Sequence, residues 1–138
     1  MHVTLEQPTG ARLVTGAGQE IAIPATLRYT AGDPLAVHID FPSHVTVDGE
    51  AVTWTFARAL LSEGLRAPAG PGTVRVRPRG ASHTDVEFHA PVGVAMLRFA
   101  TSDLYRFLAR TYTVIAPGEE TLAAELDQGL VTLFGGRV

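Results

Sequence analysis

Cysteine and lysine are both absent from this 138-residue sequence. Without cysteine the chain forms no disulfide, offers no thiol nucleophile and cannot hold a metal through sulfur, a pattern that suits a reducing compartment. Without lysine, all 11 basic residues are arginine, and 14 acidic residues leave a net charge of -3. A chain of this charge repels polyanions unless a local basic patch overcomes the overall field.

Long apolar runs are also missing. No uninterrupted apolar stretch approaches the roughly 20 residues that span a bilayer, and residues 1–6 lack the basic region and apolar run of a signal peptide. We therefore expect a cytoplasmic protein without direct membrane insertion. The composition, 46% hydrophobic and 18% charged, is typical of folded proteins, and the length suits a single domain over residues 1–138.

The segment from residue 3 to residue 56 has the pattern of short antiparallel strands separated by glycine-containing turns. In residues 35–41, for example, His38 and Asp40 alternate with apolar neighbours, as expected when successive side chains of a strand point to opposite faces. Similar segments recur after residue 72. The clearest expected strands are residues 21–29, 35–41, 52–56, 73–78, 83–90 and 92–99.

Three helices are expected, the first over residues 57–63 and ending at Gly64. Ser102 can cap a second helix, which leaves Asp103, Arg106 and Arg110 towards water. A third follows Pro117 and Gly118, and completes a C-terminal helical hairpin. The pattern predicts an α+β fold with two antiparallel sheets, each followed by a helix. The apolar faces of the last two helices are Leu104, Phe107, Leu108 and Thr111 or Tyr112, and Leu122, Leu126, Leu130, Leu133 and Phe134.

One strand carries a row of potential metal ligands. His83, Asp85, Glu87 and His89 alternate, so that they share one face of residues 83–90. Neighbouring positions on such a face lie roughly 7 Å apart, and a mononuclear site normally needs ligands that converge from another element.

The preceding strand offers a better explanation of this row. A turn at residues 80–82 would place Arg75 opposite Glu87 and Arg77 opposite Asp85. These charges would pair on a solvent-exposed face, each pair worth roughly a few tenths of a kcal/mol. We therefore assign no metal ligand.

The same strand provides the one basic patch that could bind nucleic acid. Alternating arginines can follow phosphates where aromatic side chains offer stacking platforms. Here Arg75, Arg77 and Arg79 face an acidic partner strand, and Phe88 points to the other side. A single-stranded nucleic-acid-binding module is thus the alternative function, and we expect no nucleic-acid partner.

Signals for catalysis and cofactor binding are missing. Ser43 and His44 are adjacent in a turn, no serine lies in a nucleophile elbow, and the glycines near residues 16–18 and 70–72 lack the lysine of a phosphate loop. We expect no catalytic residue, no cofactor and no enzymatic activity. Trp54 lies among apolar neighbours and is assigned to the core.

Several stretches resemble the SsgA-like sporulation and cell-division proteins of actinomycetes, and together they extend over nearly the whole chain. They are residues 52–65 running into 68–72, residues 104–112 ending at Pro117 and Gly118, and residues 27–29 followed by Asp33, Pro34 and Val37.

This resemblance implies a non-catalytic adaptor that positions division septa during sporulation. Such a protein would recruit or stabilise the ring of FtsZ, the tubulin-like division GTPase, directly or with another SsgA-like or membrane-associated division protein. The family's fold is similar to the whirly architecture, and its members assemble as bell-shaped trimers. The expected location is the division septum.

The break between the last two helices is the candidate partner-binding site, because it forms a rigid and exposed corner with polar residues around it. An ordinary helix break with a solvated face is the alternative interpretation. The candidate residues are Arg106, Arg110, Pro117, Gly118, Glu119 and Glu120.

Overall fold

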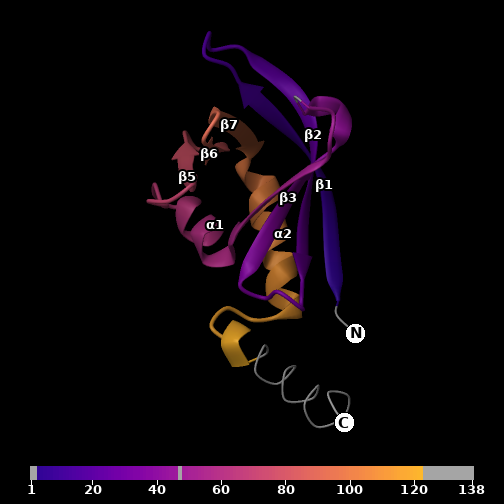
Figure 1. The fold of residues 1–138 in the computed structure, drawn as a ribbon. Coiled ribbons are helices and arrows are strands. Elements are labelled where there is room, and N and C mark those ends of the chain that lie inside the picture. Colours follow the sequence, from indigo (N-terminus) through magenta and orange to yellow (C-terminus); the bar gives the residue numbers. More distant parts are fainter. Residues whose placement is uncertain (1–2, 47, 123–138) are drawn as a thin grey trace.

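Seven antiparallel strands form one sheet in the order β4-β3-β2-β1-β7-β6-β5 (Figure 1). The computed structural model describes residues 3–46 and 48–122 of the chain. The elements are β1 (Thr4–Val14), β2 (Glu20–Thr30), β3 (Ala36–Phe41), a 3-10 turn (Ser43–Val45), β4 (Val52–Ala57), α1 (Arg58–Gly64), β5 (Val74–Arg79), β6 (His83–Ala90), β7 (Gly93–Ala100) and α2 (Thr101–Val114).

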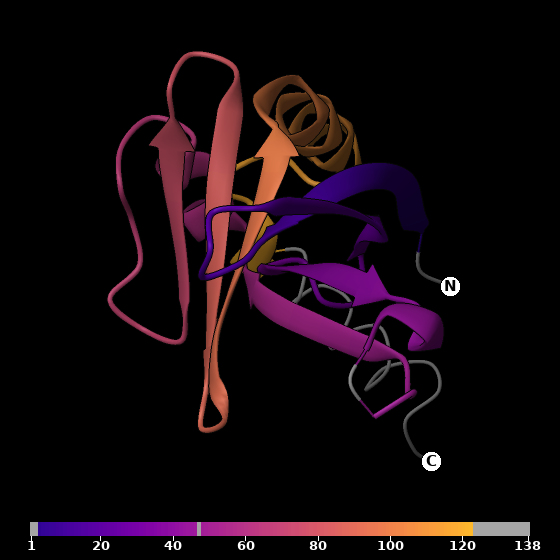
Figure 2. The same cartoon turned by 90° about the horizontal axis from the view of Figure 1, so that it is seen from above.

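The prediction of two separate sheets is wrong. β1 spans 11 residues and pairs with β2 along its whole length, but its last four residues also pair with β7. This second ladder runs from Ala11 opposite Phe99 to Val14 opposite Met96 and joins the two halves. Seen from above, β5 to β7 run in a different direction from β2 to β4, so the single sheet is strongly curled (Figure 2).

The curl brings aromatic side chains of the two halves together. The ring of Trp54 on β4 lies 4.6 Å from the ring of Phe88 on β6, and Phe41 on β3 packs edge-on against Phe88 at 6.2 Å. Trp54 is half-buried against the core, which confirms its predicted packing role. These contacts, together with the ladder between β1 and β7, hold the curled sheet in shape.

The helices cover the inner face of the sheet. α2 packs on β1, β6 and β7, whereas α1 packs on β4 and β5. The buried face of α2 consists of Leu104, Phe107, Leu108 and Thr111, as the apolar spacing predicts. The residue at the N-cap position of α2 is Ala100, and no side chain caps the helix there. Ser102 lies inside the first turn, so the prediction that it caps the helix is wrong.

Gly64 ends α1 as predicted, but for a packing reason. It lies in the last turn, with Leu65 as the capping residue, and is buried against β5. A Cβ atom on Gly64 would lie 2.3 Å from the Cβ of Val76, so only glycine permits this contact. The predicted third helix falls mostly on residues 123–138, outside the described residues.

Candidate partner-binding site

The corner that follows α2 is organised by a buried arginine at the start of α1. Arg58 is 1% exposed. Its Nη1 donates to the carbonyl oxygens of Thr111 at 3.3 Å and Ile115 at 2.8 Å, and its Nη2 donates to Glu120 Oε2 at 2.7 Å. The last carbonyls of a helix lack partners within the helix, so Arg58 supplies hydrogen bonds where α2 ends.

Two tyrosine rings flank the Arg58 guanidinium. Its central carbon lies 5.1 Å from the ring centroid of Tyr29 on β2 and 5.0 Å from that of Tyr112 on α2. Both distances suit cation–π interactions. Tyr29 is fully buried and donates to the carbonyl oxygen of Pro34, and its burial raises the pKa of its phenol. Arg58 thus connects the sheet to the end of α2.

Glu120 completes this arrangement from the far side of the corner. Besides its contact with Arg58, its Oε1 accepts a hydrogen bond from the backbone N–H of Gly118 at 2.8 Å. The hydrogen bond from Arg58 is the largest cause of a lowered pKa of Glu120. Its side chain is only 15% exposed, so Glu120 braces the corner, whereas Pro117, Gly118 and Glu119 are exposed.

The two arginines predicted at this site lie on α2 itself. Both are exposed; Arg106 pairs with Asp103, and Arg110 donates to Gln7 on β1. At about 1.5 Å per residue, Arg106 lies roughly 12 Å along the helix axis before Val114. The predicted residues therefore form an exposed corner and a separate polar stripe on α2, rather than one cluster.

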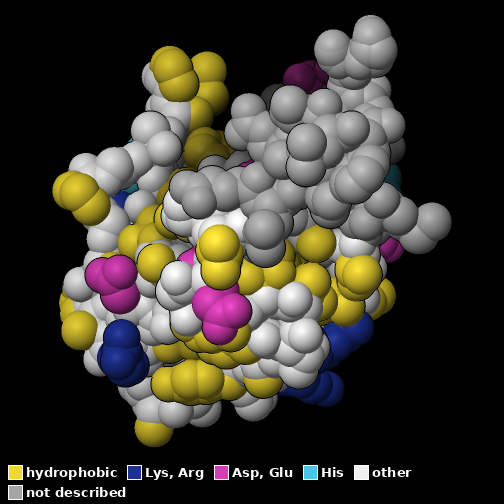
Figure 3. Space-filling view, turned by 90° about the horizontal axis from the view of Figure 1, so that it is seen from below, with side chains coloured by type: hydrophobic (Ala, Val, Ile, Leu, Met, Phe, Trp, Pro, Cys, Tyr) yellow, Lys and Arg dark blue, Asp and Glu magenta, His cyan; other side chains and the backbone are white. Residues whose placement is uncertain are grey.

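Exposed apolar side chains surround the same end of the molecule. β1 starts there, and the turn between β2 and β3 lies beside it, because Thr4 pairs with Thr30. Val3, Leu35 and Leu122 are 57%, 56% and 54% exposed. Seen from below, apolar side chains form much of the described surface, with charged groups scattered among them (Figure 3). Such a surface suits contact with another protein.

The hairpin of β5 and β6 has the predicted register but different ion pairs. Arg75 lies opposite Glu87, and Arg77 opposite Asp85. However, Asp85 is fully buried and accepts two hydrogen bonds from Arg98 on β7, at 2.8 and 3.2 Å, while Arg77 pairs diagonally with Glu87 at 3.0 Å. The prediction of directly opposed, solvent-exposed pairs is therefore wrong.

Arg98 links the two halves of the curled sheet. Its Nη1 donates to Glu20 on β2 at 3.0 Å, while its other nitrogens hold Asp85 on β6. The hydrogen bonds to Asp85 are the largest cause of a raised pKa of Arg98. Since the backbone ladder between the halves is only four residue pairs long, this ion pair reinforces their junction.

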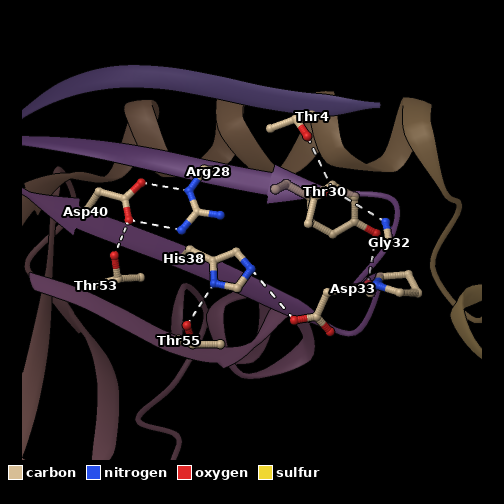
Figure 4. A network of polar contacts seen from close by, with 11 residues as sticks. Thr4, Arg28, Thr30, Gly32, Asp33, His38, Asp40, Thr53 and Thr55 are labelled. Atoms are coloured by element: carbon tan, nitrogen blue, oxygen red, sulfur yellow. Dashed lines mark hydrogen bonds and ion pairs between the residues drawn. The ribbon is translucent and has the colours of Figure 1, made fainter. Parts of the chain in front are cut away.

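A second polar network lies on the outer face of β2 to β4 (Figure 4). Arg28 holds Asp40 through two hydrogen bonds of 2.8 and 3.1 Å and lowers the pKa of that carboxyl. Beside them, His38 Nδ1 lies 2.7 Å from Thr55 Oγ1, and its Nε2 lies 3.7 Å from Asp33. Burial is the main cause of a lowered pKa of His38, which favours the neutral ring.

Within residues 3–46 and 48–122, no three or more His, Asp or Glu side chains form a group that could hold a metal ion. His83 and His89 lie at opposite ends of β6; His83 contacts Ser82, and His89 contacts Glu87. In the same part of the chain, no helix is both long and apolar enough to cross a membrane.

Sequence reasoning missed Arg58 and Arg98 as organising residues. Each had a signal, since each is a lone arginine among apolar neighbours, in Phe56-Ala57-Arg58-Ala59-Leu60 and in Met96-Leu97-Arg98-Phe99. A charged residue in such a run is rarely buried unless it has a partner.

Fold and site together define a small α+β protein whose buried charges are held in structural ion pairs. The chain belongs to the SsgA family, described as Streptomyces sporulation and cell division protein, whose family model matches residues 23–120. This confirms the resemblance seen in the sequence.

Relatives named sporulation-specific cell division protein SsgB match almost the whole chain. The Salinispora tropica protein is 41% identical, over 97% of this chain and 95% of its own, and the Streptomyces coelicolor protein is 39% identical, over 94% and 95%.

Two solved structures share the fold. A sporulation-specific SsgA-like cell division protein from Thermobifida fusca has a TM-score of 0.83 and 29% identity, with 94% of this chain and 95% of that chain covered. A structure reported with SsgB mutations that correlate to longitudinal cell division during sporulation of Streptomyces coelicolor has a TM-score of 0.79 and 36% identity, with 89% and 97% covered.

Proposed function

We propose that this protein is a non-catalytic adaptor in sporulation-specific cell division, which positions septa by recruiting or stabilising the FtsZ ring. Membership of a family of sporulation and cell division proteins supports the process. The corner after α2 supports the adaptor role, because it combines a fixed backbone with exposed side chains.

The hydrogen bonds that hold this corner from within are the observation that carries the proposal. Arg58 and Glu120 hold residues 115–120 from within, so that Pro117 and Glu119 project from a pre-organised backbone. A surface that is ordered before binding loses less conformational entropy when a partner docks. The exposed Leu35 and Leu122 add apolar area at the same end.

The proposal includes self-association and further partners. A homotrimer would cover some of the exposed apolar surface, and the protein would meet FtsZ at the septum directly or beside another SsgA-like or membrane-associated division protein. Apolar side chains lie exposed at two ends of the sheet, since Ile21, Val92 and Val94 are exposed at the end opposite Leu35. One end can therefore serve assembly while the other contacts FtsZ.

Imaging of FtsZ in sporulating cells tests this function. In cells that lack the gene, we expect fluorescent FtsZ to form few regularly spaced rings, and a wild-type copy to restore them. A Glu119→Arg copy should restore them poorly, because it reverses the charge of the exposed corner. Glu63→Arg, a matched charge reversal at an exposed position of α1, should act as wild type. Regular rings in the deletion strain would refute the role in positioning.

A further inference from the structure

Three exposed arginines alternate along the outer face of β5, and we call Arg75, Arg77 and Arg79 the arginine strip. Alternate residues of a strand lie about 7 Å apart, so the strip is about 14 Å long. β5 is an edge strand of the sheet, and the strip therefore lies along one edge of the sheet.

The carboxylates beside the arginine strip are withdrawn from water. Asp85 is fully buried and held by Arg98, and the side chain of Glu87 is 13% exposed. The side chain of Arg77, by contrast, is 45% exposed. On this face of the sheet the carboxylates are thus largely buried, whereas the guanidinium groups are exposed to water.

Within the described part of the chain, two arginines of the strip keep their charge available. No ion pair joins Arg75 or Arg79 to another residue of 3–46 or 48–122. Glu87 is shared between Arg77 and His89, at 3.0 and 3.1 Å. The neighbouring strand therefore does not cancel the strip, and its exposed charge is positive although the whole chain carries -3.

A hollow of about 350 Å³ adjoins the strip; it is lined by the loop of residues 68–71 and by Arg75, Val76, Arg77 and Glu87. Ala69 fixes this loop to the sheet edge, because its backbone exchanges two hydrogen bonds with Val76, at 2.8 and 2.9 Å. Gly70 has a φ of 100°, and a Cβ atom there would lie 2.4 Å from the carbonyl oxygen of Val74. The hollow is therefore bounded by a fixed wall.

We propose that the arginine strip and this hollow bind an extended acidic segment of a partner protein. Aspartate or glutamate at alternate positions of such a segment would repeat every 7 Å or so and match the guanidinium spacing. The hollow gives room for the backbone and a small side chain beside the strip. The inference rests on the proposed adaptor role only in taking the ligand to be a protein.

The surroundings favour a short acidic peptide over a nucleic acid. Binding of single strands relies on aromatic platforms, but Phe88 lies on the inner face of β6, and the outer face of this hairpin carries no Phe, Tyr or Trp. A long polyanion would also meet the net negative charge beyond the strip. A segment of a few acidic residues fits within about 14 Å and avoids that repulsion.

Fluorescence anisotropy with the full chain tests the inference. The probe is a fluorescein-labelled peptide of sequence Gly-Asp-Ala-Asp-Ala-Asp-Gly, and the control peptide has Asn in place of Asp. We expect the acidic peptide alone to bind, and added salt to weaken it. Arg75→Gln with Arg79→Gln should weaken binding roughly tenfold. Arg12→Gln with Arg66→Gln removes the same charge at exposed positions outside the strip and should change binding less than about twofold.

Three results would overturn the inference: no binding of the acidic peptide, equal loss in the variant of Arg12 and Arg66, or tighter binding of single-stranded oligothymidylate that the strip variant abolishes. The last result would assign the strip to nucleic acid. FtsZ binding is measured separately, on the same strip variant. If the peptide fails to bind while FtsZ still binds, only the strip inference fails and the adaptor role stands.

Discussion

Arg58 and Glu120, which are 62 residues apart in the sequence, meet through a hydrogen bond of 2.7 Å between Nη2 and Oε2. The contact fixes the backbone after α2 against the start of α1 and the ring of Tyr29. A buried ion pair contributes little net stability when both charges must be desolvated, but removal of one partner leaves the other charge uncompensated. The pair therefore favours one arrangement of the corner.

Replacement of Arg58 should destabilise the protein strongly. Arg58→Met keeps much of the volume but leaves Glu120 and the carbonyl oxygens of Thr111 and Ile115 without their donor. We expect a loss of about 3 kcal/mol in the free energy of unfolding, measured by urea denaturation. Arg66→Met, at an exposed site, should change it by less than about 0.5 kcal/mol. Equal effects of the two variants would contradict the assigned role.

The buried pair of Asp85 and Arg98 should matter more than the pair of Arg77 and Glu87, in which the Arg77 side chain is 45% exposed. Asp85→Asn removes the buried carboxylate that holds Arg98 and leaves it with the partly exposed Glu20 as a charged partner, so we expect a loss of about 2 to 3 kcal/mol in the free energy of unfolding. Glu87→Gln should cost less than about 1 kcal/mol, because water screens Arg77. A double-mutant cycle should give clear coupling of Asp85 with Arg98 and little with Arg77.

Stability should fall as the pH is lowered from 7.5 to 5.5, because His38 is buried in its neutral form. Unfolding lets the ring take up a proton at the usual pKa of about 6.5, whereas the folded protein binds that proton only at lower pH. Below pH 7.5 the unfolded state thus binds more protons, and the free energy of unfolding rises with pH. His38→Gln should reduce this slope in urea denaturation, and His44→Gln, on the exposed 3-10 turn, should not. An unchanged slope in His38→Gln would rule out this explanation.

Gly64→Ala should destabilise the protein although alanine is the better helix former. The new methyl group would overlap Val76 at 2.3 Å, and overpacking of this kind costs about 1 to 3 kcal/mol, more than the helix preference of roughly 1 kcal/mol. Gly16→Ala, in a turn where a Cβ meets no atom within 4 Å, serves as the control. Thermal unfolding of both variants should show a lower Tm for Gly64→Ala alone.

Much of the fold could be predicted because its signals are local. The alternation around His38, the spacing of Leu104 and Phe107, and the turn that sets Arg75 opposite Glu87 each lie within a few residues. The joining of both halves into one sheet could not be predicted this way. The single sheet depends on the pairing of residues 11–14 with residues 96–99. The alternation of side chains predicts a strand, but it does not show with which distant strand that strand pairs.

The candidate site was predicted only in part, for a similar reason. Exposure of Pro117 and Glu119 follows from a helix break with polar residues. The burial of Glu120 does not, because it requires Arg58 to reach across from another helix. Asp85 likewise lies opposite Arg77 in the pairing of β5 with β6. Its carboxylate nevertheless binds Arg98, because β7 pairs with β6 on the other side and places Arg98 opposite Asp85.

Co-sedimentation with FtsZ tests the central claim most directly. The purified full chain is mixed with FtsZ and GTP, and the polymers are pelleted, with GDP samples and the chain alone as controls. We predict that the protein pellets with FtsZ polymers only, that it hydrolyses no nucleotide itself, and that Glu119→Arg pellets less than Glu63→Arg. A protein that stays in the supernatant at saturating FtsZ polymer would contradict direct recruitment.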